Sequence, residues 1–474
     1  MQQRRAKIVC TLGPASADPK TIRALVDRGM DVVRLNFSHG THAEHARSFR
    51  AVRGISRRIK RPLAIIADLQ GPKIRTGALA GGKPVRLQDG GTFTLTTRRG
   101  AGDARRTGTD FRRLHQHVHR GSRILLDDGL LELRVLSVRG RDIRCRVVHG
   151  GELGEHKGIN LPHSTLGIPL LDAKDRGDLA FALRHGADYI AVSFVRSAQD
   201  ILAVRRLIRR GGGSAKIIAK LEKAEALAHL DEILKVSDAV MVARGDLGVE
   251  MPPEKVPPAQ KRIIQRAREF CLPVITATQM LDSMTRNPRP TRAEASDVAN
   301  AVFDGSDALM LSGETASGRY PLETVSMMDR IIREAEAVRR PHVPYLPALP
   351  DDDISESICR GVCEAARALP VRCIAVFTET GRSARVVAHY RPGCPIAAFS
   401  PDERTRRRLA LLWGVRPHRI ARVRDIDALA RTAEKRLIEE GLARRGDLIG
   451  IIAGTPLSKA GTTNMMKLHI VGLP

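Results

Sequence analysis

Eight short apolar runs recur along the first two-thirds of the chain, and most are followed by a stretch with the hydrophobic spacing of an amphipathic helix. Residues 19–28, 198–210 and 291–302 are such stretches. Buried parallel strands read as continuous apolar runs, and a strand followed by a helix, repeated eight times, is typical of a closed parallel barrel. The pattern therefore predicts a (β/α)₈ barrel, with strands at residues 7–12, 31–37, 63–68, 189–194, 216–221, 239–243, 273–276 and 308–311.

The repeat breaks once, between the third and fourth runs. Residues 72–165 instead alternate apolar and polar positions with the period of β-strands, and Asp-Gly and Arg-Gly pairs mark turns. An insertion in this loop lies over the face of the barrel that carries the carboxyl ends of its strands. We predict a small β-barrel that acts as a lid, with strands at residues 85–87, 93–97, 124–126, 131–138 and 143–148.

A second change of pattern comes at residues 337–353, where proline and aspartate accumulate and a linker is expected. Beyond it, residues 354–474 alternate apolar runs with helical segments, which predicts a separate, open α/β domain. The barrel then occupies residues 1–71 and 166–336. The expected strands of the C-terminal domain are 373–378, 395–399, 419–423, 448–452 and 467–471.

Composition places the chain among globular proteins. It has 474 residues, enough for two or three domains, with 42% hydrophobic and 28% charged residues. No apolar run approaches the roughly 18 residues that span a bilayer, and the N-terminus lacks the hydrophobic segment of a signal peptide. We therefore expect a cytoplasmic protein with no membrane partner, whose seven scattered cysteines are reduced thiols.

The net charge of +27 raises the question of nucleic-acid binding, because clustered basic side chains release counterions from phosphate backbones. However, 3% aromatic residues leave little for stacking on bases, and arginine is spread along the whole length. We expect no nucleic-acid partner and interpret the charge as a general attraction for anionic metabolites. An RNA-binding protein is the weaker, non-enzymatic alternative.

Polar residues cluster at the carboxyl ends of the predicted barrel strands, where the catalytic groups of such barrels project. Many recur at a spacing of two, so they share one direction and should converge above the barrel. The strand ends carry Arg34, Asn36 and Ser38; Asp68, Lys73 and Arg75; Lys220 and Glu222; Arg244 and Asp246; Thr276 and Thr278; and Ser312 and Glu314.

Glu222 and Asp246 follow successive strands, close enough to hold one Mg²⁺ ion. This ion prefers a few carboxylates and keeps positions free for water and substrate phosphate. Simple ion pairs with Lys220 and Arg244 are the alternative. Lys220, beside the proposed metal, could instead stabilise charge on a transferring phosphoryl group. Because no P-loop sequence exists, Arg34 and Arg75 are the candidate phosphate clamps within the barrel.

Six segments resemble the pyruvate kinase family, in the family's order and over nearly the whole chain. They are KIVCTLGP at 7–14, RLNFSHG at 34–40, MVARGDLGVE at 241–250, TATQML at 276–281, NPRPTRAE at 287–294 and LSGET at 311–315. The resemblance implies an enzyme that moves the phosphoryl group of phosphoenolpyruvate to ADP, giving pyruvate and ATP, in a homotetramer. A phosphoenolpyruvate-handling lyase or aldolase on a similar barrel is the enzymatic alternative, and it would need no nucleotide site.

The resemblance also implies roles for individual residues. Arg34 grips the phosphoryl group and Lys220 stabilises the transition state. The backbone amides of Gly245 and Asp246 contact the substrate carboxylate, which Thr278 also contacts while it helps to deliver a proton to the enolate.

Metal and nucleotide contacts follow from the same resemblance. Glu222 and Asp246 bind the catalytic Mg²⁺ cofactor. Lys157, in the lid, and Arg75, at the root of the lid, match contacts to the phosphates of ADP or ATP.

One departure from the family concerns K⁺, which many pyruvate kinases bind beside the phosphoryl group. Asn36, Ser38, Asp68 and the carbonyl of Leu69 match its ligands, but the family's usual Thr-Lys-Gly-Pro-Glu reads Leu-Gln-Gly-Pro-Lys, ending at Lys73. A lysine in place of that glutamate supplies a fixed positive charge. We therefore hypothesise that the Lys73 ammonium replaces K⁺, which would then not be required.

The C-terminal domain resembles the family's regulatory domain. Its first strand ends at Thr378 and leads into Thr380, Gly381, Arg382 and Ser383 at a helix start, where amides and hydroxyls form a phosphate site. Residues 461–463 could close over it. We predict activation by a phosphorylated sugar or nucleotide bound here, with ordinary helix capping as the alternative.

Overall fold

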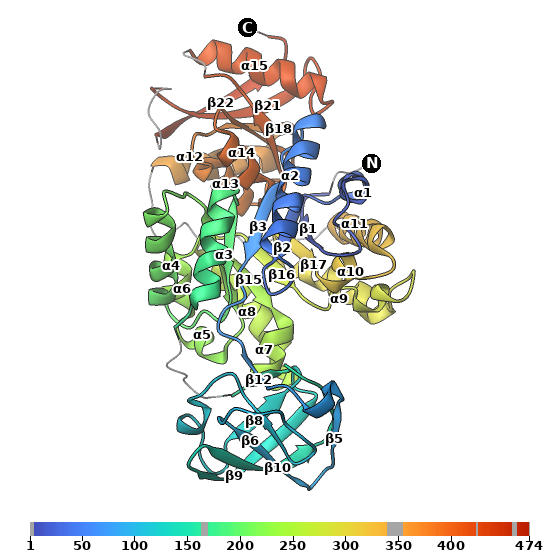
Figure 1. The fold of residues 1–474 in the computed structure, drawn as a ribbon. Helices are drawn as coiled ribbons and strands as arrows, with labels where there is room; N and C mark the ends of the chain where they lie inside the picture. Colours follow the sequence, from blue (N-terminus) through green and yellow to red (C-terminus); the bar gives the residue numbers. More distant parts are fainter. Residues whose placement is uncertain (1–3, 163–168, 339–353, 423–424, 457–461, 474) are drawn as a thin grey trace.

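The computed structural model describes residues 4–162, 169–338, 354–422, 425–456 and 462–473, which form three parts (Figure 1). A closed barrel lies in the middle, the inserted β-domain projects from one end, and the C-terminal domain covers the other end. Within the described residues, no helix combines the length and the apolar character needed to cross a membrane.

The barrel contains all eight predicted strands, which are parallel and close in the order β1-β17-β16-β15-β14-β13-β3-β2. Buried side chains such as Ile66, Ile218 and Met241 fill its interior. Because these strands are buried on both faces, each has the continuous apolar sequence that revealed it. The strands are β1 (Lys7–Leu12), β2 (Val32–Asn36), β3 (Ala64–Asp68), β13 (Tyr189–Val192), β14 (Lys216–Leu221), β15 (Ala239–Ala243), β16 (Val274–Ala277) and β17 (Ala308–Leu311).

Helices alternate with the strands and cover the outside of the barrel. In α1 (Pro19–Arg28), Asp18 accepts hydrogen bonds from the amides of Lys20 and Thr21, and Gly29 ends the helix at φ 122°. The other barrel helices are α2 (His42–Arg58), α3 (Ala173–Arg184), α4 (Ala198–Arg210), α5 (Ala224–Ala228), α6 (Leu230–Val236), α7 (Arg244–Glu250), α8 (Val256–Glu269), α9 (Arg292–Asp304), α10 (Gly313–Ala316) and α11 (Pro321–Ala337).

The insert is a small β-domain around an apolar core that includes Phe93, Leu133 and Ile143. Its sheet has the order β4-β12-β8-β9-β10-β6-β7, and β11 pairs with β5 separately. The five predicted strands are present. The strands β4, β7, β11 and β12, which have two or three residues each, were not predicted. The strands are β4 (Ile74–Arg75), β5 (Val85–Leu87), β6 (Thr92–Thr96), β7 (Arg106–Gly108), β8 (Arg123–Leu126), β9 (Leu131–Arg139), β10 (Asp142–His149), β11 (Gly151–Leu153) and β12 (Gly158–Asn160).

The C-terminal domain is a five-stranded sheet in the order β20-β19-β18-β21-β22, with β22 antiparallel to β21. Helices pack against it, and most of the predicted linker lies outside the described residues. Its elements are α12 (Ile354–Ala368), β18 (Val371–Phe377), α13 (Arg382–His389), β19 (Ile396–Ser400), α14 (Glu403–Arg408), β20 (Val415–Arg419), α15 (Ile426–Glu439), β21 (Leu448–Gly454) and β22 (Thr463–Ile470).

The strand predicted at residues 419–423 is wrong, because the chain turns at Gly414 (φ 68°) and forms β20 at Val415–Arg419. This strand lies at an edge of the sheet, where Pro417, which has no amide hydrogen, is tolerated. Four of the five residues of β20 are arginine, proline or histidine, so the strand does not show the apolar pattern that revealed the other strands.

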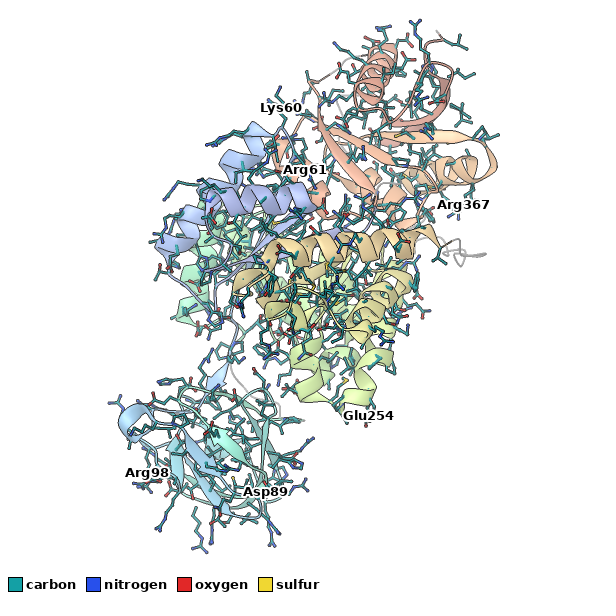
Figure 2. The ribbon with its side chains drawn as sticks, turned by 90° about the vertical axis from the view of Figure 1, so that its right-hand side faces the viewer. Lys60, Arg61, Asp89, Arg98, Glu254 and Arg367 are labelled. Atoms are coloured by element: carbon teal, nitrogen blue, oxygen red, sulfur yellow. The ribbon has the colours of Figure 1, made fainter. Side chains whose placement is uncertain are left out.

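The C-terminal domain seals the barrel at the amino ends of the strands. Ala410 and Leu411 belong to the apolar cluster of the barrel interior, and the Lys7 Nζ atom donates to the Val415 carbonyl at 2.8 Å. Figure 2 shows Lys60 and Arg61 at this end, whereas Glu254 lies at the end nearest the lid. The carboxyl ends of the strands are therefore the open end, beneath the lid.

Candidate active site

Lys220 lies at the centre of the charged groups at the open end of the barrel. Its Nζ atom is 2.8 Å from Glu222 Oε1, 3.2 Å from Asp68 Oδ1 and 2.6 Å from Ser193 Oγ. Burial opposes the charge, but the two carboxylates outweigh it and raise the pKa of Lys220 above its ordinary value. The side chain is therefore a fixed cation on the barrel axis side of β14.

Arg34 and Asp68 extend this arrangement across the neighbouring strands β2 and β3. Arg34 Nε lies 2.7 Å from Asp68 Oδ2, and Arg34 Nη1 donates to Thr11 Oγ1 at 3.0 Å. Burial favours a protonated Asp68, but Lys220 and Arg34 overcome it and hold the pKa of Asp68 below its usual value. Charges alternate from Arg34 through Asp68 and Lys220 to Glu222, and all four side chains are nearly buried.

Glu222 and Asp246 stand at the ends of the paired strands β14 and β15, as predicted from their order. Burial raises the pKa of Glu222, Lys220 opposes this, and the negative charge of Asp246 adds to it. A buried carboxylate beside a second acid suits a divalent cation, which balances the negative charge. Of the alternative ion pairs, Glu222 does pair with Lys220, but Arg244 pairs with Asp297 at 2.7 Å rather than with Asp246.

Glu222 and Asp246 can supply only part of the coordination shell of a Mg²⁺ ion. Among the described residues, no group of three or more His, Cys, Asp or Glu side chains could hold a metal. Two carboxylates alone would leave the other positions to water and substrate oxygens, which is the usual arrangement for Mg²⁺.

Thr278 sits in a strained turn after β16. Thr278 and Gln279 have φ angles of 67° and 53°, a left-handed conformation that costs about 1–3 kcal/mol for each non-glycine residue. Arg244 supports the turn by donating to the Thr278 carbonyl at 2.7 Å, and the Gly245 amide donates to Thr278 Oγ1 at 2.7 Å. The turn thus holds the Thr278 hydroxyl next to the start of α7.

The two predicted nucleotide contacts lie at the root of the lid. Arg75 in β4 pairs with Gly158 in β12, next to Lys157, and Arg75 Nη1 donates to the His156 carbonyl at 3.0 Å. The Lys157 ammonium is 3.0 Å from Asp127 in the lid. Arg75 lies in β4 and Lys157 directly precedes β12, so both residues lie where the chain passes between the barrel and the lid.

The mouth of the barrel is cationic. Burial lowers the pKa of His39, and the positive charges of Arg75, Arg34, Lys73 and Lys174 lower it further. A neutral histidine among four cations marks a region that favours bound anions such as phosphates.

The four residues matched to a K⁺ site lie on adjacent strand ends, since Asn36 pairs with Asp68 in the parallel register. Asn36 Oδ1 accepts from the Ser38 amide at 3.1 Å, and the Leu69 carbonyl accepts from Ser193 Oγ at 2.8 Å. The Lys73 ammonium reaches toward the lid, where it lies 3.5 Å from Asp128 Oδ1.

The sequence reasoning missed Ser193, and it named Arg244 among the strand-end residues without predicting its role. Ser193 bonds both Lys220 and the Leu69 carbonyl, and Arg244 holds the strained Thr278 turn. Ser193 directly follows β13, so its position at the carboxyl end of a barrel strand could have identified it as a site residue. Nothing in the sequence reveals the targets of Arg244, because its partners come from the turn after β16 and from α9.

The residues of the proposed effector site come together in the C-terminal domain. Thr378 Oγ1 accepts from the Gly381 amide at 2.9 Å, and Ser383 in the first turn of α13 lies with its Oγ 2.5 Å from Thr463 Oγ1. The Arg382 amide donates weakly to Thr380 Oγ1 at 3.5 Å. Gly461 lies outside the described residues, whereas Thr463 begins β22.

Two family models match the chain: the pyruvate kinase barrel domain over residues 3–325 and the pyruvate kinase alpha/beta domain over residues 356–469. Pyruvate kinases from three bacteria align with 99% of this chain. That of Corynebacterium glutamicum is 46% identical over 98% of its length, that of Sporosarcina psychrophila 43% over 81%, and that of Clostridium acetobutylicum 41% over 100%. The crystal structure of a pyruvate kinase from Cryptosporidium parvum has a TM-score of 0.93 at 37% identity, covering 99% of this chain and 96% of that one.

Proposed function

This chain belongs to the pyruvate kinase family of phosphotransferases, and on that premise we propose that it transfers the phosphoryl group of phosphoenolpyruvate to ADP. The products are pyruvate and ATP, in the last step of glycolysis. The observation that carries the proposal is the alternating cluster Arg34, Asp68, Lys220 and Glu222 beside Asp246, at the end of the barrel that faces the lid. Its cations are held rigidly where phosphoryl charge would be placed.

Lys220 and Arg34 act on the phosphoryl group. Phosphoryl transfer needs positioning and electrostatic stabilisation more than covalent chemistry, and both cations are fixed by Asp68 before substrate arrives. Glu222 and Asp246 would hold Mg²⁺, which when bound supplies a Lewis acid for substrate oxygens. The preset geometry avoids the cost of reorienting these groups during the reaction.

Thr278 and the start of α7 act on the other end of the substrate. The amide of Asp246, in the first turn of α7, would bind the carboxylate of phosphoenolpyruvate, and the Gly245 amide would join it by exchanging its bond to Thr278 Oγ1 for one to the substrate. Loss of the phosphoryl group leaves an enolate, whose carbon must take a proton. The Thr278 hydroxyl, bonded to the Gly245 amide, is placed to help deliver that proton.

Arg75 and Lys157 would bind the phosphates of ADP from the root of the lid, where the cationic mouth attracts them. A nucleotide site distinguishes this function from a lyase or aldolase that uses phosphoenolpyruvate alone. Incubation with phosphoenolpyruvate, ADP and Mg²⁺, followed by ³¹P NMR, tests the difference. Loss of the phosphoenolpyruvate signal should match gain of the ATP γ-phosphate signal, whereas release of inorganic phosphate without ATP would reject the proposal.

We expect activity without K⁺, because the Lys73 ammonium is one of the positive charges around His39 at the mouth of the barrel and could replace the charge of that ion. In buffers free of monovalent metal ions, KCl should change the rate of the wild type by less than about twofold. Lys73→Glu restores the charge that K⁺-dependent relatives carry, and its activity should fall about tenfold without K⁺ and recover with it. Strong activation of the wild type by K⁺ would contradict the assignment.

We further propose that a phosphorylated sugar or nucleotide activates the enzyme by binding at Thr378, Thr380 and Ser383. Supporting this, the hydroxyls and the start of α13 gather at one spot. Ser383→Glu places a negative charge there and should abolish activation by such compounds without changing basal activity, whereas Ser383→Ala, which adds no charge, should weaken it less. Kinetics with sugar phosphates and nucleotide monophosphates decide the matter: full activation of Ser383→Glu would reject this site.

We also propose a cytoplasmic homotetramer. Supporting a cytoplasmic location, no disulfide bond joins the seven cysteines, all of which lie in the described part of the chain. Supporting self-association, β22 is an edge strand that exposes Met466, Leu468 and Ile470. Light scattering should give about four times the chain mass of 51.9 kDa, and a mass of one chain at micromolar concentration would reject the assembly.

A further inference from the structure

Three arginines and a histidine meet where the barrel joins the C-terminal domain, at the end opposite the active site. Arg268 lies in the last turn of α8, Arg385 and His389 lie on α13, and Arg391 follows α13. This arginine cluster (Arg268, Arg385, His389 and Arg391) is assembled from two domains, and the contact between Cys271 and Arg385 beside it joins residues 114 positions apart in the chain.

Contacts with the loop before β17 bring the members of the cluster together. Arg391 Nη2 donates to the Gly305 carbonyl at 2.9 Å and lies 3.0 Å from Asp307 Oδ1. Arg268 packs against the same glycine, with Nη1 3.0 Å from the position that a Cβ atom on Gly305 would take. The Arg385 carbonyl lies 3.9 Å from the sulfur of Cys271, three residues after Arg268.

Each member of the cluster has a buried nitrogen that lacks a hydrogen-bond partner among the described residues. These atoms are Arg268 Nε, Arg385 Nε, Arg391 Nη1 and His389 Nε2. His389 is 8% exposed and the Arg391 side chain 9% exposed. Buried polar groups are nearly always paired, and an unpaired buried donor on a cation is costly. Four such atoms in one place point to a missing acceptor.

The acids around the cluster do not balance its charge. Asp307 gives one oxygen to Arg391 and the other to the Val274 amide. The Glu336 carboxylate accepts from the amides of Arg5 and Ala6, and Glu269 pairs with Arg266. Three guanidinium groups thus face two carboxylates, Asp307 and Glu336, and among the described residues Asp307 alone forms an ion pair with the cluster.

The protonation of His389 agrees with this excess of positive charge. Burial and the charges of Arg268, Arg391 and Arg385 lower the pKa of His389 to about 3. The ring is therefore neutral, and it could donate one N–H to an anion without adding to the repulsion.

We propose that the arginine cluster binds a small oxyanion of the phosphate class, which bridges α8 of the barrel and α13 of the C-terminal domain. Guanidinium groups suit this ligand because their planar forks donate paired hydrogen bonds to phosphate oxygens. The bound anion would accept hydrogen bonds from the buried donors that lack partners, and it would lower the net positive charge of the arginine cluster. The ligand would thus tie together two domains at their junction.

Localisation of a heavy oxyanion tests the site directly. Crystals of the full chain, grown without phosphate or sulfate, are soaked in selenate and examined at the selenium edge. We expect an anomalous peak within hydrogen-bond distance of Arg268 and Arg385. No peak there, or a carboxylate from a second copy in that place, would overturn the proposal.

A phosphate titration tests binding in solution. Thermal unfolding is followed in rising inorganic phosphate, with chloride used to match ionic strength, for the wild type, Arg268→Gln and Arg262→Gln. Arg262 is an exposed arginine on the same helix and serves as the matched control. Phosphate should raise the melting temperature of the wild type and the control, with at least tenfold weaker apparent affinity in Arg268→Gln.

Two further outcomes decide the proposal. Without phosphate, Arg268→Gln should be at least as stable as the wild type, because it removes a positive charge from a cationic cluster together with a buried Nε donor that lacks a partner. Arg385→Gln should weaken the phosphate effect in the same way. Equal phosphate responses in Arg268→Gln, Arg385→Gln and Arg262→Gln would overturn the proposal, and a selenate peak alongside such equal responses would mean an adventitious ion only.

Discussion

Replacement of Lys220 by methionine is expected to lower kcat for pyruvate formation by about a thousandfold. The Lys220 ammonium is fixed by Asp68, Glu222 and Ser193 before substrate binds, so it acts as a preorganised charge. Fixed cations that stabilise transferring phosphoryl groups contribute about 10³ to 10⁵ in rate. Steady-state kinetics with saturating phosphoenolpyruvate, ADP and Mg²⁺ measure the loss, which should fall on kcat more than on KM.

The matched control is Lys216→Met. Lys216 begins the same strand and is also ion-paired, with its Nζ 2.9 Å from Asp238, but it lies at the opposite end of the barrel. Because Lys220→Met leaves two buried carboxylates without their cation, its fold must be checked by circular dichroism. Lys220→Arg keeps a charge there and should retain more activity. A folded Lys220→Met enzyme within tenfold of wild-type kcat would contradict the role of Lys220.

Replacement of Asp246 by asparagine should lower kcat/KM by about a hundredfold at millimolar Mg²⁺. Asp246 is one of two carboxylates offered to the ion, and a bound metal contributes several kcal/mol of transition-state stabilisation. The loss should be partly recovered as Mg²⁺ is raised, because asparagine keeps one oxygen ligand. A titration of activity against Mg²⁺ measures the shift.

Asp238→Asn is the control for this experiment, since Asp238 precedes β15 whereas Asp246 follows it. The Asp238 variant should show the wild-type dependence on Mg²⁺, even if the loss of the ion pairs with Lys216 and Arg205 makes it less stable. Glu222→Gln should behave like Asp246→Asn. If the Asp246 variant kept the wild-type Mg²⁺ dependence, the metal would have to bind elsewhere.

The barrel and the grouping of charged residues at its open end could be predicted from the sequence because burial controls both. Strands buried on two faces have continuous apolar sequences, so the polar residues that end them stand out. The spacing of Lys220 and Glu222, and the order of β14 and β15, then placed both acids beside one lysine.

Other features depend on contacts that a sequence does not display. Strand β20 carries Arg416, Pro417 and His418 at a sheet edge, so its composition hides it. The lid strands β4 and β12 are too short to show alternation, although they pair with each other where the chain enters and leaves the lid. The sequence led us to expect that the Lys73 ammonium takes the place of K⁺. Its contact with Asp128 could not be predicted, because it depends on the position of the lid.

The central claim is that this open barrel end transfers a phosphoryl group from phosphoenolpyruvate to ADP with the help of Mg²⁺. Its most direct test is the initial rate of pyruvate formation from phosphoenolpyruvate and ADP, coupled to lactate dehydrogenase. We predict rapid, ADP-dependent turnover with Mg²⁺ that stops when EDTA removes divalent ions. No pyruvate at any Mg²⁺ concentration, or pyruvate formed equally well without ADP, would contradict the account.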